Sequence, residues 1–237
     1  NTTGAYNTAT GVPALCSNTT VLSNTSSTYF ALYFNNLGST NVACGVSSLA
    51  FNTSGNSNAA IGYTALYSNT TGFSNVAIGT DALYKNTSRG NLVAVGDSTL
   101  YWNGSGASQS FHATANTGIG SRALYSNTTG DNNTAQGFKA LHSNTTGFEN
   151  TAEGSQAMYF NTSGFDNSAY GMKALYSNAS GQYNVANGYQ ALYTNTSGHR
   201  NVAVGVLAGG SNNGSENVFV GYSAGGSETS ASNKLYI

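Results

Sequence analysis

The side chains that could do acid–base or metal chemistry are few and scattered in this 237-residue chain. Catalysis by paired carboxylates, or by a nucleophile and its base, needs groups held within hydrogen-bond reach. No spacing in the sequence brings such groups together, so we predict no catalytic, cofactor-binding or metal-binding residues and no enzyme. A calcium-binding β-roll is excluded as well, because it needs an Asp in every turn. The acids and histidines are Asp81, Asp97, Asp131, Glu149, Glu153, Asp166, Glu216, Glu228, His112, His142 and His199.

Attachment of sugar is a second chemistry that the residue pattern indicates. Asn-x-Ser/Thr is the acceptor for N-linked glycans, and ten copies recur at one position of a repeat. Repetition of one ancestral unit would also align them, so each copy alone is a weak signal. We expect glycans on this column, either N-linked or O-linked on the adjacent Thr and Ser. The N-linked candidates are Asn18, Asn52, Asn69, Asn86, Asn103, Asn127, Asn144, Asn161, Asn178 and Asn195.

Cys16 and Cys44 are the only cysteines, and a surface protein normally oxidises such a pair. Regular stacking of the repeats separates them by about 10 Å, beyond the roughly 7 Å that a disulfide allows between Cα atoms. A bridge therefore requires the intervening unit, 24–40, to be irregular, and that unit lacks the usual glycine. The alternatives are one disulfide and two buried thiols.

All these residues belong to a sequence repeat, and the repeat sets their positions in the fold. Its clearest sign is the segment "ALYSNTTG", which occurs at 65–72 and again at 123–130. The unit is N-[TV]-A-x-G-x-x-A-L-Y-x-N-T-[TS]-G-x-x, and its residues are numbered here as positions 1 to 17. A fixed period of this length is typical of a solenoid whose coils bury their apolar sides on one another. We predict an all-β parallel β-solenoid, or β-roll, of about 14 coils. Its 17-residue repeats cover 1–200, and 16-residue repeats with a terminal strand that begins at Asn233 cover 201–237.

Each repeat position suggests a structural role. Ala at position 3 and Gly at position 5 point inward from a strand, whereas positions 2 and 4 face outward. Segments such as "TDALYKN", and Pro13 before an Ala-Leu pair, favour a short helical turn over a second strand. Position 9, usually Leu, forms the core. Asn at position 12 is expected to end the turn in a left-handed conformation, Gly at position 15 to reverse the chain, and Asn at position 1 to bond along the solenoid.

One step breaks the period, since Leu92 to the next unit start at Asn116 spans 24 residues. The seven extra residues are assigned to a loop at 107–115, which must bulge outward because the core has no room. Trp102, Phe111 and His112 make this the candidate ligand loop. The tyrosines of position 10 form a column that we expect to pack, with a sugar-stacking ledge as the alternative.

The composition excludes two classes of partner. Only 6% of residues are charged, the net charge is -1, and the Lys and Arg residues occur singly, so no basic patch for nucleic acid exists. No apolar run approaches the roughly 18 residues of a membrane span. The start, "NTTGAYNTATG", reads as the interior of a repeat. We interpret it as a mature, extracellular or cell-surface fragment whose targeting segment has been removed.

The motifs "NVAIG" (75–79), "NAAIGYTALYSNTTG" (58–72) and "ENVFVGYSAGG…SNKLYI" (216–237) resemble the head repeats of trimeric autotransporter adhesins and related bacterial and phage fibre proteins. The resemblance covers nearly the whole chain. It implies a left-handed parallel β-roll, surface exposure and an adhesive or structural role without catalysis. Position 4 departs from that pattern in mid-chain, where three copies of Glu153 at an axis would bury unpaired carboxylates. We therefore expect no close trimer along the whole length.

The expected function is that of an extracellular structural protein, a glycosylated filament subunit that forms a head-to-tail homopolymer. Fourteen coils span roughly 65 Å at one strand spacing each. The assembly ends are assigned to Asn7, Thr8 and Ala9 and to Leu235, Tyr236 and Ile237. The alternatives are an adhesin or tail-fibre segment that binds cell-surface carbohydrate and, last, an ice-binding protein that uses the Thr of position 2.

Overall fold

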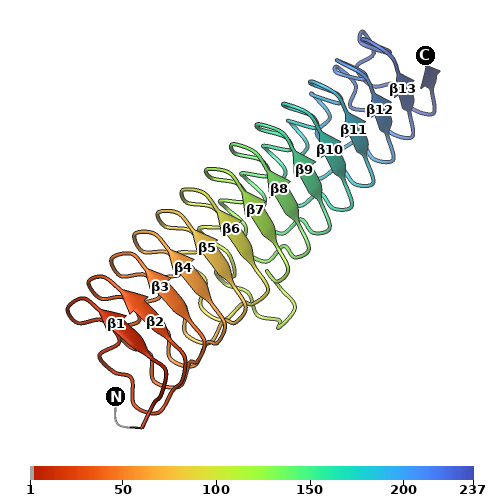
Figure 1. Cartoon of the computed structure of the whole chain (residues 1–237). Coiled ribbons are helices and arrows are strands. Elements are labelled where there is room, and N and C mark those ends of the chain that lie inside the picture. The colour runs from red at the N-terminus through yellow and green to blue at the C-terminus, as the bar shows by residue number, and fades with distance from the viewer. Residues whose placement is uncertain (1–2) are drawn as a thin grey trace. The chain divides into compact units, whose positions relative to one another are not determined.

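The computed structural model describes residues 3–237 and shows an all-β chain, a parallel β-solenoid with one short strand per coil (Figure 1). This confirms the predicted fold class. The chain divides into two compact units, Asn1–Ser121 and Arg122–Ile237. The first contains β1 (Thr8–Thr10), β2 (Thr25–Ser27), β3 (Val42–Cys44), β4 (Ala59–Ile61), β5 (Val76–Ile78), β6 (Val93–Val95) and β7 (Thr117–Ile119). The second contains β8 (Thr134–Gln136), β9 (Thr151–Glu153), β10 (Ser168–Tyr170), β11 (Val185–Asn187), β12 (Val202–Val204), β13 (Val218–Val220) and β14 (Leu235–Tyr236).

Within each unit every strand pairs in parallel with the next strand in the sequence. The partner of a residue usually lies 17 positions further on, as Val185 pairs with Val202. Val202 pairs with Val218 after 16 residues, but Val218 pairs with Leu235 after 17. The last unit therefore begins at Lys234, and the predicted start at Asn233 and a run of 16-residue repeats were wrong.

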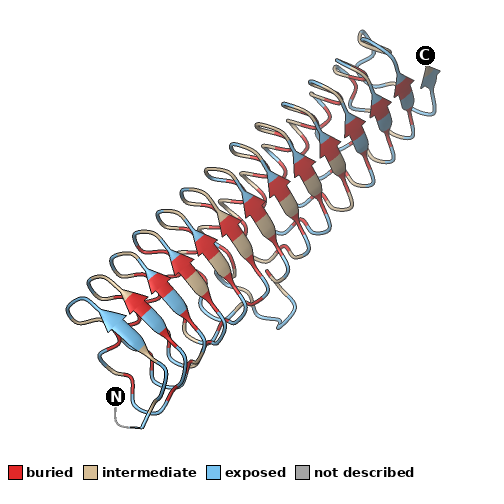
Figure 2. Ribbon diagram, viewed as in Figure 1, coloured by how far each residue is buried: buried red, intermediate tan, exposed pale blue. Residues whose placement is uncertain are grey.

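The core is a narrow column of small and branched side chains. In the coil of β4, Ala60, Ala65 and Leu66 have no exposed surface, whereas the outward Ile61 is 41% exposed. Buried and exposed residues alternate along the strands in the same way (Figure 2). The predicted position-9 column is confirmed as core. Its members are Leu15, Leu32, Leu49, Leu66, Leu83, Leu100, Leu124, Leu141, Met158, Leu175 and Leu192.

The expected helical turn after each strand is absent from the described residues, which contain turns there instead. Two residues of this segment have left-handed backbone conformations, as Thr64 (φ 53°) and Leu66 (φ 52°) illustrate. A right-handed helix needs φ near −63° at every residue, so this segment cannot be helical. Asn69, at position 12, is not left-handed, and its role lies in its side chain. No helix of membrane-spanning length and hydropathy occurs in residues 3–237.

Ala152 tests the narrowness of this core. It pairs with Ala135 and Ala169, and all three are fully buried. We predict that Ala152→Leu lowers the free energy of unfolding by about 1–3 kcal/mol, because extra methylenes must enter a filled layer. Glu153→Leu is the matched control, since Glu153 faces outward. Thermal and denaturant unfolding measure both; equal effects of the two substitutions would contradict the assignment of the faces.

Candidate functional site

The sequon asparagines of position 12 are buried, and all except Asn18 donate Nδ2 to protein oxygens. Asn52 has no exposed surface, and its Nδ2 donates to Gly55 O at 2.9 Å and to Asn35 Oδ1 at 2.7 Å. Asn69 Nδ2 repeats this pattern one coil later, with bonds to Gly72 O and Asn52 Oδ1. The side-chain amides therefore form a ladder that runs from coil to coil.

This ladder does not fit the predicted role in N-glycosylation. An N-linked sugar would be attached to Nδ2, but that atom lies inside the turn, where in every sequon asparagine except Asn18 it donates to protein oxygens. The folded chain has no room for a glycan at any of the ten positions, each at most 1% exposed. They are Asn18, Asn52, Asn69, Asn86, Asn103, Asn127, Asn144, Asn161, Asn178 and Asn195.

The Asn column of position 1 closes the same turn, as the sequence predicted. Asn41 Nδ2 donates to Gly55 O at 2.9 Å, so this carbonyl accepts from both columns. Asn58 donates its backbone N–H to Asn41 Oδ1 at 3.0 Å, which links the coils. A Cβ on Gly55 would lie 2.3 Å from Gly72 O. In this coil glycine is thus required at position 15, because the two turns approach closely.

The hydroxyl groups beside the sequon asparagines differ in availability. At position 13, Thr53 Oγ1 and Thr70 Oγ1 each donate to the position-13 carbonyl of the next coil, at 2.9 Å. At position 14, Thr71, Ser88 and Thr146 are exposed, and their hydroxyls make no hydrogen bond to the described residues. Of the two positions that follow the asparagine, position 14 therefore carries most of the free hydroxyls, with Thr87 as an exception at position 13.

Substitution of Asn144 tests whether the position-12 asparagines stabilise the fold or carry sugar. Its Nδ2 donates to Asn127 Oδ1 and Gly147 O, and its Oδ1 accepts from Asn161 Nδ2 at 2.7 Å. Asn144→Ala leaves buried partners unpaired, so we predict a loss of about 1–3 kcal/mol in unfolding free energy.

The control is Thr146→Ala, which destroys the same sequon but keeps the ladder. We expect near-wild-type stability in chemical denaturation and no loss of an N-linked glycan in the intact mass. A mass decrease by one glycan in the Thr146 variant would contradict the structural role.

The position-10 tyrosines pack against one another, as expected. In the first unit, Tyr67, Tyr84 and Tyr101 stack with ring centroids 5.1 Å apart and planes within 6°. In the second, Tyr176 and Tyr193 stack at 5.0 Å. A sugar stacks on the free face of an aromatic ring, so rings that cover each other cannot serve as a continuous ledge.

His142 occupies a place in this column, between Tyr125 and Tyr159, at centroid distances of 5.3 and 5.0 Å. Burial, followed by the positive charges of Lys139 and Arg122, lowers the pKa of His142 below its ordinary value. As pH falls through that ordinary value, the unfolded chain takes up the proton first, so folding stability decreases.

We predict that His142→Tyr, which restores the residue of the column, gains stability relative to the wild type as the pH falls from about 7.5 to about 5. Thermal melts at the two pH values measure the difference. A difference independent of pH would show that His142 protonation is not linked to folding.

The inserted loop lies a few residues before its predicted place. Asn103 Nδ2 donates to Ala113 O at 2.9 Å, the bond that a position-12 Asn makes three residues ahead. Ala113 is fully buried and takes position 15, so the extra residues fall within 104–112 and not within 107–115. Trp102 is 39% exposed, Phe111 is 61% exposed, and the His112 ring packs edge-on against Phe111 at 4.7 Å.

Arg89 anchors this loop, and sequence reasoning missed it. It replaces the Gly of position 15, and its guanidinium donates to the carbonyls of Ala107 at 2.6 Å and Gln109 at 2.9 Å. Arg89 fits there because the next coil departs into the loop instead of making the usual close turn. The sequence signal for this contact was the Arg at position 15, which is Gly in most coils.

We predict that deleting 105–111, which restores the 17-residue spacing, destabilises the chain while Arg89 remains, because Arg89 then meets a normal turn. Adding Arg89→Gly to the deletion should restore the melting temperature. The decisive measurement is the recovery of the melting temperature when Arg89→Gly is added to the deletion. A deletion tolerated equally well with and without Arg89→Gly would contradict the proposed dependence.

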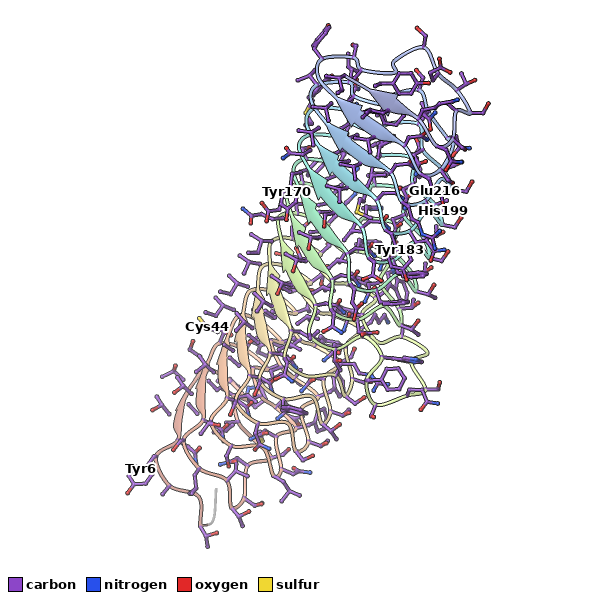
Figure 3. All side chains as sticks on the ribbon, turned by 90° about the vertical axis from the view of Figure 1, so that its right-hand side faces the viewer. Tyr6, Cys44, Tyr170, Tyr183, His199 and Glu216 are labelled. Carbon is purple, nitrogen blue, oxygen red and sulfur yellow. The ribbon has the colours of Figure 1, made fainter. Side chains whose placement is uncertain are left out.

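The two cysteines are free and exposed, so the structure forms neither the disulfide nor the buried pair. Cys44 projects outward from β3 (Figure 3). The irregularity that a bridge requires is absent from the strands, because β2 pairs in register with both β1 and β3.

Four of the predicted assembly residues, Thr8, Ala9, Leu235 and Tyr236, lie on β1 and β14, and Asn7 and Ile237 flank these strands. Thr8 and Ala9 are exposed in β1, although position 3 is buried in other coils. Leu235 is 66% and Ile237 92% exposed. Tyr236 stacks on Phe219 at 5.2 Å.

The acids and histidines are dispersed over both units. A hydrogen bond and charge repulsion from Asp166 raise the pKa of exposed Glu149, and Arg200 pairs with Glu216 at 3.1 Å on the surface. Tyr183, His199 and Glu216 lie on the side of the second unit away from Tyr170 (Figure 3). Among residues 3–237, no three His, Cys, Asp or Glu side chains are grouped closely enough to hold a metal ion. The sequence matches no protein-family model and no curated protein.

Proposed function

We propose that this chain is an extracellular structural protein, the subunit of a surface filament or fibre. The observation that carries the proposal is the use of its polar side chains. The amides of positions 1 and 12 and the hydroxyls of position 13 form hydrogen bonds between neighbouring coils, as Asn58, Asn69 and Thr70 illustrate. Such bonding resists separation of the coils and leaves few of these groups for a substrate.

The constancy of the repeat supports the proposed head-to-tail assembly. Because each coil pairs with the next in the same register, a strand of one copy can add to a strand of another by the same bonds. The equivalent pairing places Lys234 opposite Asn7, Leu235 opposite Thr8 and Tyr236 opposite Ala9. A heterologous contact of this kind propagates into a filament.

Glycosylation, where present, would fall on the hydroxyls of position 14. They recur in most coils, although Leu37 replaces the hydroxyl in one of them, and those of Thr71, Ser88 and Thr146 are exposed and make no hydrogen bond to the described residues. Sugar at this position would add a hydrated layer to the surface of a chain in which only 6% of the residues are charged.

Electron microscopy of the purified chain tests the assembly. We expect filaments with an axial repeat of roughly 65–70 Å, one strand spacing for each of fourteen coils. Ala9→Glu should abolish them without lowering stability, because Ala9 is exposed in one chain and buried at the proposed joint. Thr8→Glu, which faces outward, is the control. A dispersed monomer at high concentration would refute the assembly.

A carbohydrate-binding adhesin is the second candidate function. It is favoured by the exposed rings of Phe111 on the loop and of Trp102 just before it, since exposed aromatic side chains at loops are typical of recognition sites. A glycan array with the chain and a Trp102→Ala variant separates this function from a purely structural one. An ice-binding role lacks the continuous Thr array that it needs, because Val76 and Val93 interrupt position 2.

A further inference from the structure

The column of stacked rings in the second unit ends at Tyr193. Tyr176 covers one face of the Tyr193 ring at 5.0 Å, with planes 6° apart. On the next two coils, position 10 is occupied by Gly210 and Gly226, which have no side chain to cover the other face. The ring is therefore half-stacked, and the place of the next ring is open.

That place is a pocket of about 300 Å³, and Tyr193, Gly210 and Gly226 contribute to its lining. The volume is at the lower end of the range for small-molecule sites, which fits one sugar ring better than a larger ligand. The two glycines create the space, because a side chain at Gly210 would occupy the position that Tyr193 has in its own coil.

The remaining polar groups around the pocket are neutral. Gln190, Thr194, Ser211 and Ser223 contribute an amide and three hydroxyls. None of these side chains makes a hydrogen bond within residues 3–237, so their donors and acceptors are available to a ligand. Lys, Arg, Asp and Glu are missing from the lining, which disfavours a phosphate-bearing, carboxylate or cationic ligand.

We propose that this pocket binds one neutral pyranose residue of a carbohydrate. The polarised C–H groups of a sugar ring face the electron-rich surface of an aromatic ring, and its hydroxyls both donate and accept. Tyr193 offers the surface, and Gln190, Thr194, Ser211 and Ser223 offer partners around its rim. The site is separate from the loop at 104–112 and does not depend on filament assembly.

The first experiment titrates the chain with the methyl glycosides of glucose, galactose, mannose and N-acetylglucosamine, followed by ligand-observed NMR and by the Tyr193 ring resonances. We expect weak, saturable binding of at least one glycoside, with shifts at Tyr193. Methyl glucuronide, which adds a carboxylate, should bind more weakly than the neutral sugars. Failure of all four neutral sugars at saturating concentration, or preference for the glucuronide, would overturn the proposal.

Two variants locate the binding. Tyr193→Ala should weaken the affinity at least about tenfold by removing the stacking surface. Gly210→Tyr should block the pocket by extending the column, as in other coils, and should leave the melting temperature at or above the wild-type value. It therefore separates loss of binding from loss of folding.

Tyr193→Phe is the control, because it keeps the stacking face and should keep binding. Undiminished binding by a folded Gly210→Tyr variant would place the sugar elsewhere and overturn the assignment. Filaments that form normally in a non-binding variant would leave the proposed structural function intact, so the two proposals fail separately. A long glycan that binds more tightly than its terminal monosaccharide, with the same variant profile, would identify a polymer as the source of the ring.

Discussion

In most coils the fold depends on a single backbone carbonyl, that of position 15, which accepts hydrogen bonds from two buried asparagines. In the coil of β3, Gly55 O receives Nδ2 of Asn41 and of Asn52, both at 2.9 Å. Unpaired, such a buried carbonyl and two amides would each cost about 1–3 kcal/mol. Their mutual satisfaction closes the turn, and the Oδ1 atoms left over accept from the next coil. Closure of one coil and attachment of its neighbour are thus the same interaction.

Other features follow from this arrangement. Position 15 is glycine in most coils because a Cβ there would collide with the next coil, and its exceptions include Val21 in the first coil and Arg89 and Ala113 beside the inserted loop. The chain must also turn sharply between its strand and its asparagine. It does so with left-handed residues at positions 7 and 9, including Leu66 at φ 52°, a conformation that costs a residue with a side chain of order 1 kcal/mol or more. The ladder bonds and the buried Leu column offset that cost.

The sequence was sufficient for the fold class because repetition multiplies each weak signal. The 17-residue period, the inward Ala, the Leu column and the role of Asn41 as a ladder residue were all predictable. The conformation after the strand was not, because the Ala and Leu of that segment favour a helix and only close packing between coils imposes a left-handed backbone on Leu66. Likewise, Asn52 matches a sequon perfectly, and only its burial shows that the amide is used internally. The pocket beside Tyr193 was missed because its signal is a missing ring, Gly210, in an otherwise regular column.

The coil ladder also organises the two proposed roles. It makes each coil equivalent to the next, which suits a protein that extends by addition, and it confines recognition to places where the repeat is interrupted. The loop after Asn103 and the glycines at 210 and 226 are such places. Function in a repeat of this kind is therefore best sought in its irregular coils.

The central claim is that buried asparagine amides hold the coils together, and hydrogen exchange of the Asn side-chain Nδ2 protons, measured by NMR on the intact chain, tests it most directly. We expect the amides of Asn52, Asn69 and Asn144 to exchange only through large-scale unfolding, orders of magnitude more slowly than that of exposed Asn132. Exchange of the position-12 amides at the rate of Asn132 would contradict the account.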